Sequence, residues 1–431
     1  MTALLGLLVV LAACSGDDDP APVGGEDDGD GSPALSDGIA TGDTDGDAPA
    51  LILSAIDATG DALFPCVGEA GTGSVQVVYL QQLPEDLVGP LAEAFRGAVG
   101  DYQRRCGGVA AGAIEVAVGY REGADDVCQL GQLAGAAVVV ADAADDATVD
   151  CLGSATRLVW HEGGASDPST TAGTQAPPAV RASRSIAAAL AEGVVDDRAV
   201  VVMHDGTERS VRAVEDGVLP RLEAASIETE ATVPVDCGGT ITAPDLDGRF
   251  VVTLLPAPCL ADVVDAAAAA GDDVRWLVIE DDLSIAPVDG LAFAESAFDT
   301  ALAYEFAPTI VAGLPRDRAP VAHDLACVEF LDGFTGNDTA FPSAAFTAHA
   351  RLCSTIAGLI GALHAAGTDP TPDAIREAIP TSSSAIVLSQ GQRRGAGDDP
   401  WLAPALVTTI EWNADCDCWT YVRGPDLAPV D

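Results

Sequence analysis

The stretch that decides the fold begins Ser74-Val75-Gln76-Val77-Val78-Tyr79-Leu80 and continues to Val140. Residues 75–80 are mostly apolar and rich in residues that favour strands, which predicts a buried strand. Residues 87–105 then place apolar side chains at helical spacing, which predicts a helix that ends at Gly107. A strand is expected over 113–118, a short helix over 127–133 and an all-apolar strand over 135–140. The stretch is therefore predicted to be a βαβαβ unit.

The same alternation of strand and helix continues along the rest of the chain. The last predicted helix, 341–366, is also the longest, and a hairpin is expected over 408–422. There are too many strands for one sheet of ordinary width, so the predicted class is α/β with two doubly wound parallel-sheet lobes. Further strands are expected over 157–160, 199–203, 228–233, 250–255 and 276–279, with helices over 181–192, 211–225 and 260–270.

The turn Gly107-Gly108-Val109-Ala110-Ala111-Gly112 lies between the first predicted helix and the second strand. No G-x-G-x-x-G motif follows the first strand, so a dinucleotide-binding unit is not indicated. In its order and position this turn resembles the Gly-Gly-(Ile/Val)-x-x-Gly turn of type I periplasmic solute-binding proteins, the branched-chain amino acid-binding group of ABC transport systems. The resemblance extends from about Ser74 to Gly424. It implies a hinge, a first lobe over 74–195, a second over 196–315, and a return to the first lobe with a closing hairpin over 316–424.

The first residues are small and apolar and end in Leu11-Ala12-Ala13-Cys14. This pattern is typical of a secretory signal peptide, and it resembles a bacterial lipobox in which Cys14 is lipidated, so residues 1–14 are expected to be a leader. The usual basic residues before the apolar run are missing. Residues 15–50 are rich in Asp, Gly and Pro and are expected to form an acidic disordered tether. The predicted location is extracytoplasmic, on the cell membrane, with the lipid as the only anchor.

The chain carries 67 Asp and Glu against 20 Lys and Arg, for a formal net charge of −47. Such a field repels nucleic acid and anionic membrane surfaces, so neither is an expected partner. The cationic side chains are all arginine. The chain is expected to be a monomer.

Beyond Cys14 there are ten cysteines, and an even number in an exported chain favours disulfides. Sequence proximity predicts the pairs Cys237–Cys259 and Cys327–Cys353, and some members of the family that the chain resembles carry a bridge where Cys128 and Cys151 lie. The sequence leaves the pairing of four others open: Cys66, Cys106, Cys416 and Cys418. Zinc at Cys416-x-Cys418 and calcium at 43–47 are weak alternatives, because the spacing of the first and the ligand set of the second are incomplete. No cofactor or metal is expected.

No motif for a hydrolase nucleophile, a zinc protease or a phosphate-binding loop occurs in the sequence, so no enzyme is predicted. For a binding protein of this class, the ligand is expected between the lobes, held by polar groups that follow the strands. The candidate ligand-binding residues are Gln81, Gln82, Asp142, Asp145, His161, Ser166, His204, Asp205, Glu280 and Asp281. In the amino acid binders a carboxylate after the strand that matches 276–279 receives the ligand ammonium, and Glu280 is the counterpart that the resemblance implies.

The predicted pocket departs from that of the amino acid binders. These have a Ser/Thr cluster after the third strand, where this chain has Asp142 and Asp145, which repel a carboxylate. They have an aromatic residue where this chain has His204.

Two hypotheses follow. The first is a solute-binding lipoprotein that delivers a small polar ligand, amino acid-like, amide or cationic, to the permease of an ABC uptake system. The second is a sensory or interaction lipoprotein on the same scaffold with a degenerate cleft.

Overall fold

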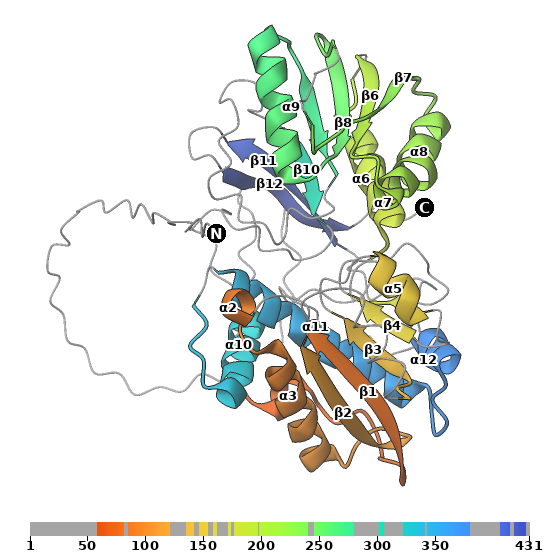
Figure 1. Ribbon diagram of the computed structural model, residues 1–431, viewed down its shortest axis with the longest axis vertical. Helices are drawn as coiled ribbons and strands as arrows, with labels where there is room; N and C mark the ends of the chain where they lie inside the picture. Colours follow the sequence, from red (N-terminus) through yellow and green to blue (C-terminus); the bar gives the residue numbers. More distant parts are fainter. Residues whose placement is uncertain are drawn as a thin grey trace, which may run out of the picture. The chain divides into compact units, whose positions relative to one another are not determined.

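The computed structural model describes residues 58–81, 85–120, 135–141, 146–153, 158–161, 171–173, 176–196, 198–239, 245–279, 301–305, 322–340, 343–379, 406–413 and 418–427. All of them belong to one compact unit, Ala50–Asp431. The described strands form two sheets, of five and seven strands, and each sheet has its own hydrophobic core (Figure 1). The first lobe and the second lobe denote these two sheets with the helices that pack on them.

The first lobe is built on a parallel sheet of order β2-β1-β3-β4-β5. Its strands are β1 (Gly73–Gln81), β2 (Gly112–Tyr120), β3 (Val138–Ala141), β4 (Leu158–His161) and β5 (Thr171–Ala172). The strands predicted from the apolar runs at 75–80, 113–118, 135–140 and 157–160 are confirmed. β1 pairs along its whole length with β2 and over four residues with β3. β1 is therefore hydrogen-bonded to a parallel strand on each of its two sides.

Helices cover both faces of this sheet. One face carries α3 (Leu91–Cys106), α10 (Ala322–Thr335), α11 (Ala344–Ala365) and α12 (Pro372–Ala378), whose apolar side chains share a core with β1 and β3. The other face carries α5 (Asp146–Gly153), where Val149 and Leu152 pack on Val78 and Leu80. The helix predicted over 87–105 is two helices, α2 (Glu85–Val88) and α3, because Gly89 has a positive φ of 74° and Pro90 follows it. The helix predicted over 127–133 lies outside the described residues.

The second lobe is built on a sheet of order β12-β11-β10-β9-β8-β6-β7. Strands β6 to β10 are parallel, and β11 and β12 add an antiparallel hairpin at one edge. The bounds are β6 (Ala199–His204), β7 (Thr229–Pro234), β8 (Arg249–Leu254), β9 (Arg275–Val278), β10 (Leu302–Glu305), β11 (Leu406–Asn413) and β12 (Cys418–Leu427). The hairpin predicted over 408–422 is thus confirmed, and its strands join the second sheet.

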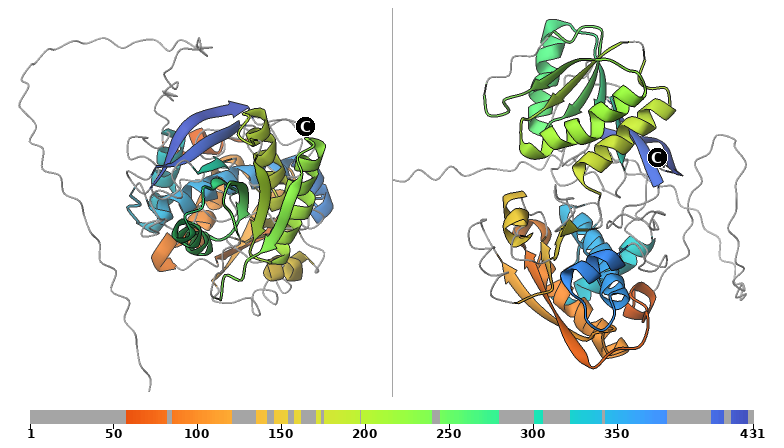
Figure 2. Two further views of the ribbon diagram at one scale, coloured as in Figure 1. Left: turned by 90° about the horizontal axis from the view of Figure 1, so that it is seen from above. Right: turned by 90° about the vertical axis from the view of Figure 1, so that its right-hand side faces the viewer.

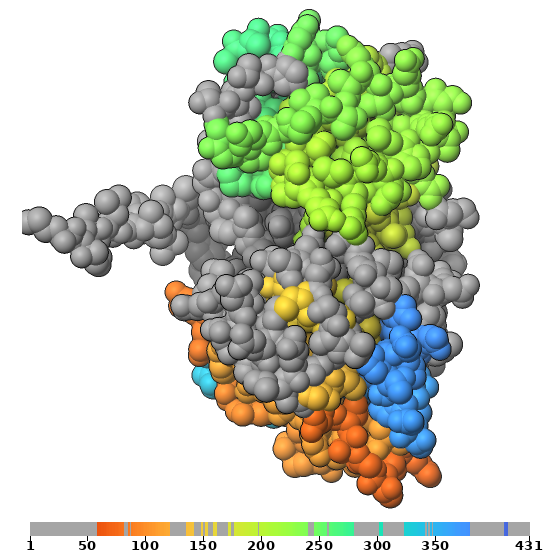
Figure 3. Space-filling view, turned by 45° about the vertical axis from the view of Figure 1, so that its right-hand side comes forward, coloured from red at the N-terminus to blue at the C-terminus, as the bar shows by residue number. Residues whose placement is uncertain are grey.

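Helices also cover both faces of the second sheet. α9 (Ala257–Ala270) packs on one face, and α6 (Pro178–Ala191) packs on the other with a continuous helical segment (Figure 2). That segment runs through α7 (Glu208–Arg212), the π-helical turn η1 (Ala213–Val218) and α8 (Leu219–Ala224). Its side chains, with those of β7, form one continuous face in the space-filling view (Figure 3).

α6 packs in the second lobe, although it lies within the range predicted for the first lobe, 74–195. Ala182, Ile186 and Ala189 of α6 pack in the core of the second lobe with Val200 and Val214. The hydroxyl of Tyr304 and that of Thr409 donate to the carboxylate of Glu192 at the C-terminal end of this helix, at 2.9 and 3.2 Å. The chain therefore enters the second lobe before Pro178. Helices α10 to α12, in contrast, pack with the first lobe, where the return of the chain was expected.

Three disulfides join described residues: Cys66–Cys106, Cys237–Cys259 and Cys327–Cys353. The last two were predicted from proximity and are confirmed. Cys66–Cys106 resolves one of the pairings that the sequence left open. Cys151 is also disulfide-bonded, and Cys128, its predicted partner, lies outside the described residues.

The Cys66–Cys106 bridge fastens the start of the described chain to the end of α3. Short helix α1 (Gly60–Leu63) precedes Cys66, and Arg105, beside Cys106, pairs with Asp61 at 2.7 Å and donates to the carbonyl of Phe64 at 3.2 Å. The bridge and the arginine therefore hold the same two segments together.

Replacing Cys66 and Cys106 together by serine should lower the free energy of unfolding. The bridge spans a sequence separation of 40, for which the chain-entropy model gives about 4 kcal/mol. Urea denaturation of the double variant, with Arg104→Gln on the same helix as a neutral surface control, measures this loss. Because Arg105 still holds Asp61 and Phe64, we expect the double variant to fold and to unfold at a lower urea midpoint. A midpoint equal to that of the parent chain would contradict a stabilising role for the bridge.

Candidate functional site

Each lobe has the strand order that creates a topological switch point. Within the parallel strands of both sheets, the first strand in sequence lies between the second and the third: β1 between β2 and β3, and β6 between β7 and β8. In open α/β sheets of this order, ligands bind outside the carboxyl ends of the strands at that point. The registers align Leu80 with Ala141 and Ala141 with His161, and they align His204 with Leu254 and Pro234. Gln81, His161, His204 and Asp205, all predicted from sequence, therefore lie on these two edges.

Gln81 is buried, and its side-chain amide holds the turn that leads into α3. Its Nε2 donates to the carbonyl of Gly89 at 2.8 Å, and its Oε1 accepts from the backbone N–H of Ala92 at 3.0 Å. Ala92 is the second residue of α3, whose N-cap position is occupied by Pro90, a residue without a capping side chain. The amide of Gln81 thus caps this helix. This geometry gives Gln81 a structural role at the edge where it was predicted to contact a ligand.

His161, the last residue of β4, is also buried, and its Nδ1 lies 3.4 Å from the carbonyl oxygen of Ala141 on the neighbouring strand. This contact joins the ends of β3 and β4. Glu162, which follows His161 in the sequence, lies outside the described residues.

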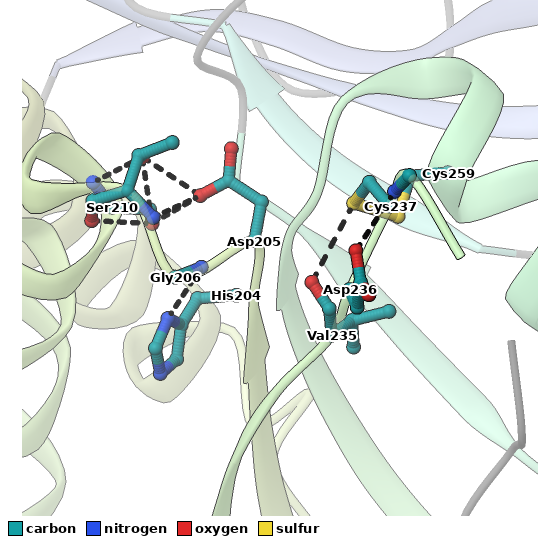
Figure 4. The surroundings of a disulfide bond; sticks show 10 residues. His204, Asp205, Gly206, Ser210, Val235, Asp236, Cys237 and Cys259 are labelled. Atoms are coloured by element: carbon teal, nitrogen blue, oxygen red, sulfur yellow. Dashed lines mark hydrogen bonds between the residues drawn. A yellow bond between two sulfur atoms is a disulfide. The ribbon is translucent and has the colours of Figure 1, made fainter. Parts of the chain in front are cut away.

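His204 and Asp205 form the turn between β6 and α7 at the second switch point (Figure 4). Nδ1 of His204 accepts from the backbone N–H of Gly206 at 3.1 Å, which leaves the proton of the neutral ring on Nε2. One carboxylate oxygen of Asp205 accepts from the N–H and hydroxyl of Thr207, at 3.0 and 2.7 Å, and from the hydroxyl of Ser210. These bonds hold the start of α7, which places a carboxylate and an imidazole N–H donor at this edge.

The strands on either side of β6 are tied to it at the same edge. The backbone N–H of Val235, just after β7, donates to the carbonyl of His204 at 2.8 Å. Two residues later, Cys237 bonds to Cys259 in the first turn of α9, which follows β8 (Figure 4). The ends of β7 and β8 are therefore covalently linked beside the His204 turn, and this makes the edge a rigid frame.

A buried polar cluster behind the first edge was missed by the sequence reasoning. His349 of α11 is fully buried, its Nδ1 donates to the carbonyl of Ala345 at 2.8 Å, and its Nε2 lies 3.8 Å from Oδ1 of Asp332 on α10. Asp332 accepts from the N–H and hydroxyl of Thr339, at 2.7 and 2.8 Å. A Cβ added to Gly89 would lie 3.4 Å from Cε1 of His349, so this ring packs against the turn held by Gln81.

The remaining predicted site residues lie outside the described part of the chain: Gln82, Asp142, Asp145, Ser166, Glu280 and Asp281, as does Cys14. Among the described residues no group of three or more His, Cys, Asp or Glu side chains is arranged to hold a metal ion. None of the helices in the described ranges combines the length and apolarity needed to cross a bilayer.

Solved structures of solute-binding proteins superpose on most of this chain. A solute-binding protein of an ABC transporter from Rhodopseudomonas palustris HaA2, in complex with p-hydroxybenzoic acid, superposes with a TM-score of 0.55 at 12% identity, covering 83% of this chain and 98% of that one. A leucine-, isoleucine-, valine-, threonine- and alanine-binding protein from Brucella ovis, in the closed conformation, gives a TM-score of 0.55 at 14% identity, covering 84% and 97%. The chain has the type I periplasmic binding protein fold.

A fatty acid ABC transporter substrate-binding protein from Thermomonospora curvata superposes with a TM-score of 0.52 at 12% identity, over 84% of this chain and 97% of that one. A scan against protein-family models and a search of curated proteins found no match. The predicted type I fold, with its two doubly wound lobes, is therefore confirmed at the level of structure.

Burial lowers the pKa of His349 below its usual value of 6.5, against the smaller opposing effects of the Ala345 carbonyl and of Asp332. In the unfolded chain the imidazole binds a proton more readily, so the unfolded state holds more protons in this range of pH. The contribution of His349 to the free energy of unfolding is fully present above about pH 6.5. It is lost as the pH falls through the lowered pKa of His349 in the folded state. The fold should therefore weaken in acid partly through His349.

Replacing His349 by Asn should make the unfolding free energy less dependent on pH below 6.5, because the Asn amide keeps a donor near Ala345 and does not titrate. Urea titrations at intervals from pH 7.5 to 5 measure the slope, and His364→Asn on the same helix is the control. An undiminished slope in the His349 variant would show that other groups cause the acid sensitivity.

Proposed function

We propose that this protein is an extracytoplasmic solute-binding lipoprotein of an ABC uptake system, which binds a small polar ligand and is not an enzyme. The observation that carries the proposal is the extent of the structural likeness. Solute-binding proteins superpose on 83–84% of this chain and over 97–98% of their own length, so the match takes in both lobes. A single doubly wound sheet occurs in many unrelated proteins, whereas this paired arrangement is much more specific.

The ligand site in this proposal lies between the lobes, at the two carboxyl edges. Its expected contacts are the Nε2–H donor of His204, the carboxylate of Asp205 and the carboxylate of Glu280, with Gln82, Asp142, Asp145 and Ser166 from the first lobe. The similar solved proteins bind p-hydroxybenzoic acid, fatty acids, or leucine, isoleucine, valine, threonine and alanine. These ligands share one carboxylate, so an amino acid-like solute is favoured over a sugar or a nucleotide.

The N-terminal features fit this role. A lipid on Cys14 and a solvated acidic tether over 15–50 would hold the binding unit near the membrane, within reach of the permease that is its proposed partner. The second candidate remains a sensory or interaction lipoprotein with the same fold and no small-molecule ligand.

The proposal is tested by thermal unfolding of the chain from Ser15 onward, disulfides intact, against amino acids, amides, polyamines, aromatic acids, fatty acids and sugars. A ligand at about 100 times its Kd adds roughly 2.7 kcal/mol to the stability of the folded state, so a true ligand should raise the midpoint clearly. No shift with any compound would remove the transport proposal and favour the interaction lipoprotein.

For any ligand that raises the midpoint, His204→Asn separates a binding role from a structural one. The Asn side-chain oxygen replaces Nδ1 as the acceptor for Gly206 but offers nothing in place of Nε2. We expect an unchanged midpoint without ligand and about tenfold weaker binding by calorimetry, the cost of one lost hydrogen bond. His204→Gln, which mimics Nε2, should recover part of the affinity. Equal affinity in both variants would place the ligand elsewhere.

A further inference from the structure

The Cys66–Cys106 bridge differs from the other two described disulfides in its access to solvent. Cys66 is exposed and Cys106 is half-buried, so a thiol in solution can reach this bond. The cysteines of Cys327–Cys353 are both fully buried in the core of the first lobe. Thiol–disulfide exchange requires a thiolate to reach one of the two sulfur atoms. The bridge Cys66–Cys106 is therefore open to attack, whereas Cys327–Cys353 is shielded.

Cys237–Cys259 is intermediate, because only one of its cysteines is accessible. Cys237 is exposed, but Cys259 is buried in the core of the second lobe. A thiolate that attacks Cys237 must expel an electron pair onto the sulfur of Cys259. A charged thiolate is disfavoured in apolar surroundings, so a buried sulfur is a poor leaving group. This bridge should therefore exchange more slowly than Cys66–Cys106.

At Cys106 the leaving sulfur has a cation beside it. Nη1 of Arg105 lies 3.9 Å from Sγ of Cys106, within hydrogen-bond range for sulfur. The same guanidinium is held in place by Asp61, Asp101 and the carbonyl of Phe64. It can therefore stabilise the negative charge that forms on Cys106 when the bridge opens.

The chain on both sides of Cys66 is held by contacts that do not involve the bridge. Before it, the buried ring of Phe64 packs on Phe330 of α10, with the ring centroids 5.8 Å apart. After it, the backbone N–H of Gly71 donates to the carbonyl of Val109, in the turn that follows α3, at 3.0 Å. The two sulfur atoms should therefore stay close together after reduction, so that the same bridge can form again.

We propose that Cys66–Cys106 is a reversible thiol-exchange site, at which Cys66 is modified by a small neutral or cationic thiol. A thiolate attacks Sγ of Cys66 and forms a mixed disulfide, the Cys66–Cys106 bond breaks, and its electron pair remains on Sγ of Cys106 as a thiolate. Attack of that thiolate on the mixed disulfide reverses the step and expels the small thiol. A second small thiol can attack instead. The two small thiols are then oxidised to a disulfide, and both cysteines are left reduced. The proposal does not depend on the proposed function.

The charge around Cys66 determines the class of thiol. Asp61 and Glu69, on either side of it in the sequence, are both exposed, and the net charge of the chain is −47. Such a field repels an anionic thiol such as 3-mercaptopropionate, whose thiolate carries two negative charges. The thiolate of cysteamine also carries an ammonium group and has no net charge. We therefore expect cysteamine to be preferred, and we expect salt to screen this preference.

Cleavage of the folded protein tests the order of reactivity. The chain from Ser15 onward is incubated with cysteamine at about pH 8, where thiols are partly ionised. Samples are quenched with N-ethylmaleimide and mapped by mass spectrometry. We expect Cys66–Cys106 to open at least about tenfold faster than Cys237–Cys259, while Cys327–Cys353 stays closed and so reports that the chain is folded. Equal rates, faster opening of either other bridge, or no opening of Cys66–Cys106 in the folded chain would overturn the proposal.

The preference for cysteamine is measured as a ratio of rates, because thiols differ in intrinsic reactivity. The ratio of cysteamine to 3-mercaptopropionate is compared between the protein and a small neutral disulfide. At low salt the ratio on the protein should be about tenfold larger. At about 1 M salt it should approach the ratio on the small disulfide. Equal ratios at low salt would overturn the assigned class of thiol.

Arg105→Gln separates an electrostatic role of Arg105 from a structural one. If the guanidinium stabilises the leaving thiolate, its loss should slow the opening of the bridge several-fold, and Arg105→Lys should recover much of the rate. Arg104→Gln changes the net charge equally and should leave the rate unchanged. If Arg105 only holds the two segments together, its loss would loosen them and speed the opening. Faster opening in Arg105→Gln would therefore overturn the role assigned to the guanidinium.

Single variants identify the sulfur that is modified. In Cys106→Ser, the exposed Cys66 should form a mixed disulfide with cystamine, the oxidised form of cysteamine. In Cys66→Ser, the half-buried Cys106 should react about tenfold more slowly. Faster modification of Cys106 would overturn the assignment of Cys66.

Reversibility is tested on the parent chain. After selective opening of Cys66–Cys106 and removal of cysteamine, the urea midpoint should match that of the double serine variant. Addition of cystamine should then restore the Cys66–Cys106 pairing and the original midpoint. A product with other pairings, or with the lower midpoint retained, would contradict a reversible site.

Discussion

The pairing of β1 with strands on both of its sides is the constraint on which the first lobe depends. A parallel strand buried on both faces must have its hydrogen bonds satisfied within the sheet and its side chains covered by helices. β2 and β3 take opposite sides of β1, and α3 and α5, which lie after β1 and β3 in the chain, cover opposite faces of the sheet. The polar side chain that ends β1, Gln81, then caps α3. Strand order thus creates the edge, and local hydrogen bonding fixes its shape.

The second lobe has the same order of strands at its switch point, but different bonds hold its carboxyl edge. Its edge is held by the backbone bond from Val235 to His204 and by the Cys237–Cys259 bridge. These two links hold the His204 turn between the ends of β7 and β8. The identities of 12–14% to proteins of the same fold are consistent with this division, because strand order depends on the apolar pattern and binding depends on a few edge residues.

Most of the elements could be predicted because their signals are local. Alternation of β-rich apolar runs and helical periodicity located β1, β2, β4 and β6 within one or two residues, and the turn chemistry of Gly107 ended α3 where the structure ends it. The placement of α6 was not predictable in this way. Its own sequence is amphipathic in either lobe, and only contacts with residues far along the chain, such as Tyr304 and Thr409 on Glu192, assign it to the second.

The residues of the candidate site could likewise be predicted only in part from the sequence. Gln81, His161, His204 and Asp205 were found because polar residues that follow parallel strands share an edge, but their hydrogen-bond partners could not be read from sequence. His349 and Asp332 lie inside helices with mostly apolar sequences, where a single polar residue looks like an ordinary surface position. The pairing Cys66–Cys106 was open for a related reason: proximity along the chain is no guide at a separation of 40.

In the second lobe, charged side chains are distributed differently at the amino ends and the carboxyl ends of the strands. Arg198, Arg249 and Arg275 lie at the amino ends of β6, β8 and β9. Arg198 pairs with Asp273, Arg249 with Glu230 and Arg275 with Asp196. The carboxyl end of β6 instead carries Asp205, whose carboxylate is engaged by neutral donors. Because exposed ion pairs contribute little stability, the arginines at the amino ends mainly offset local repulsion.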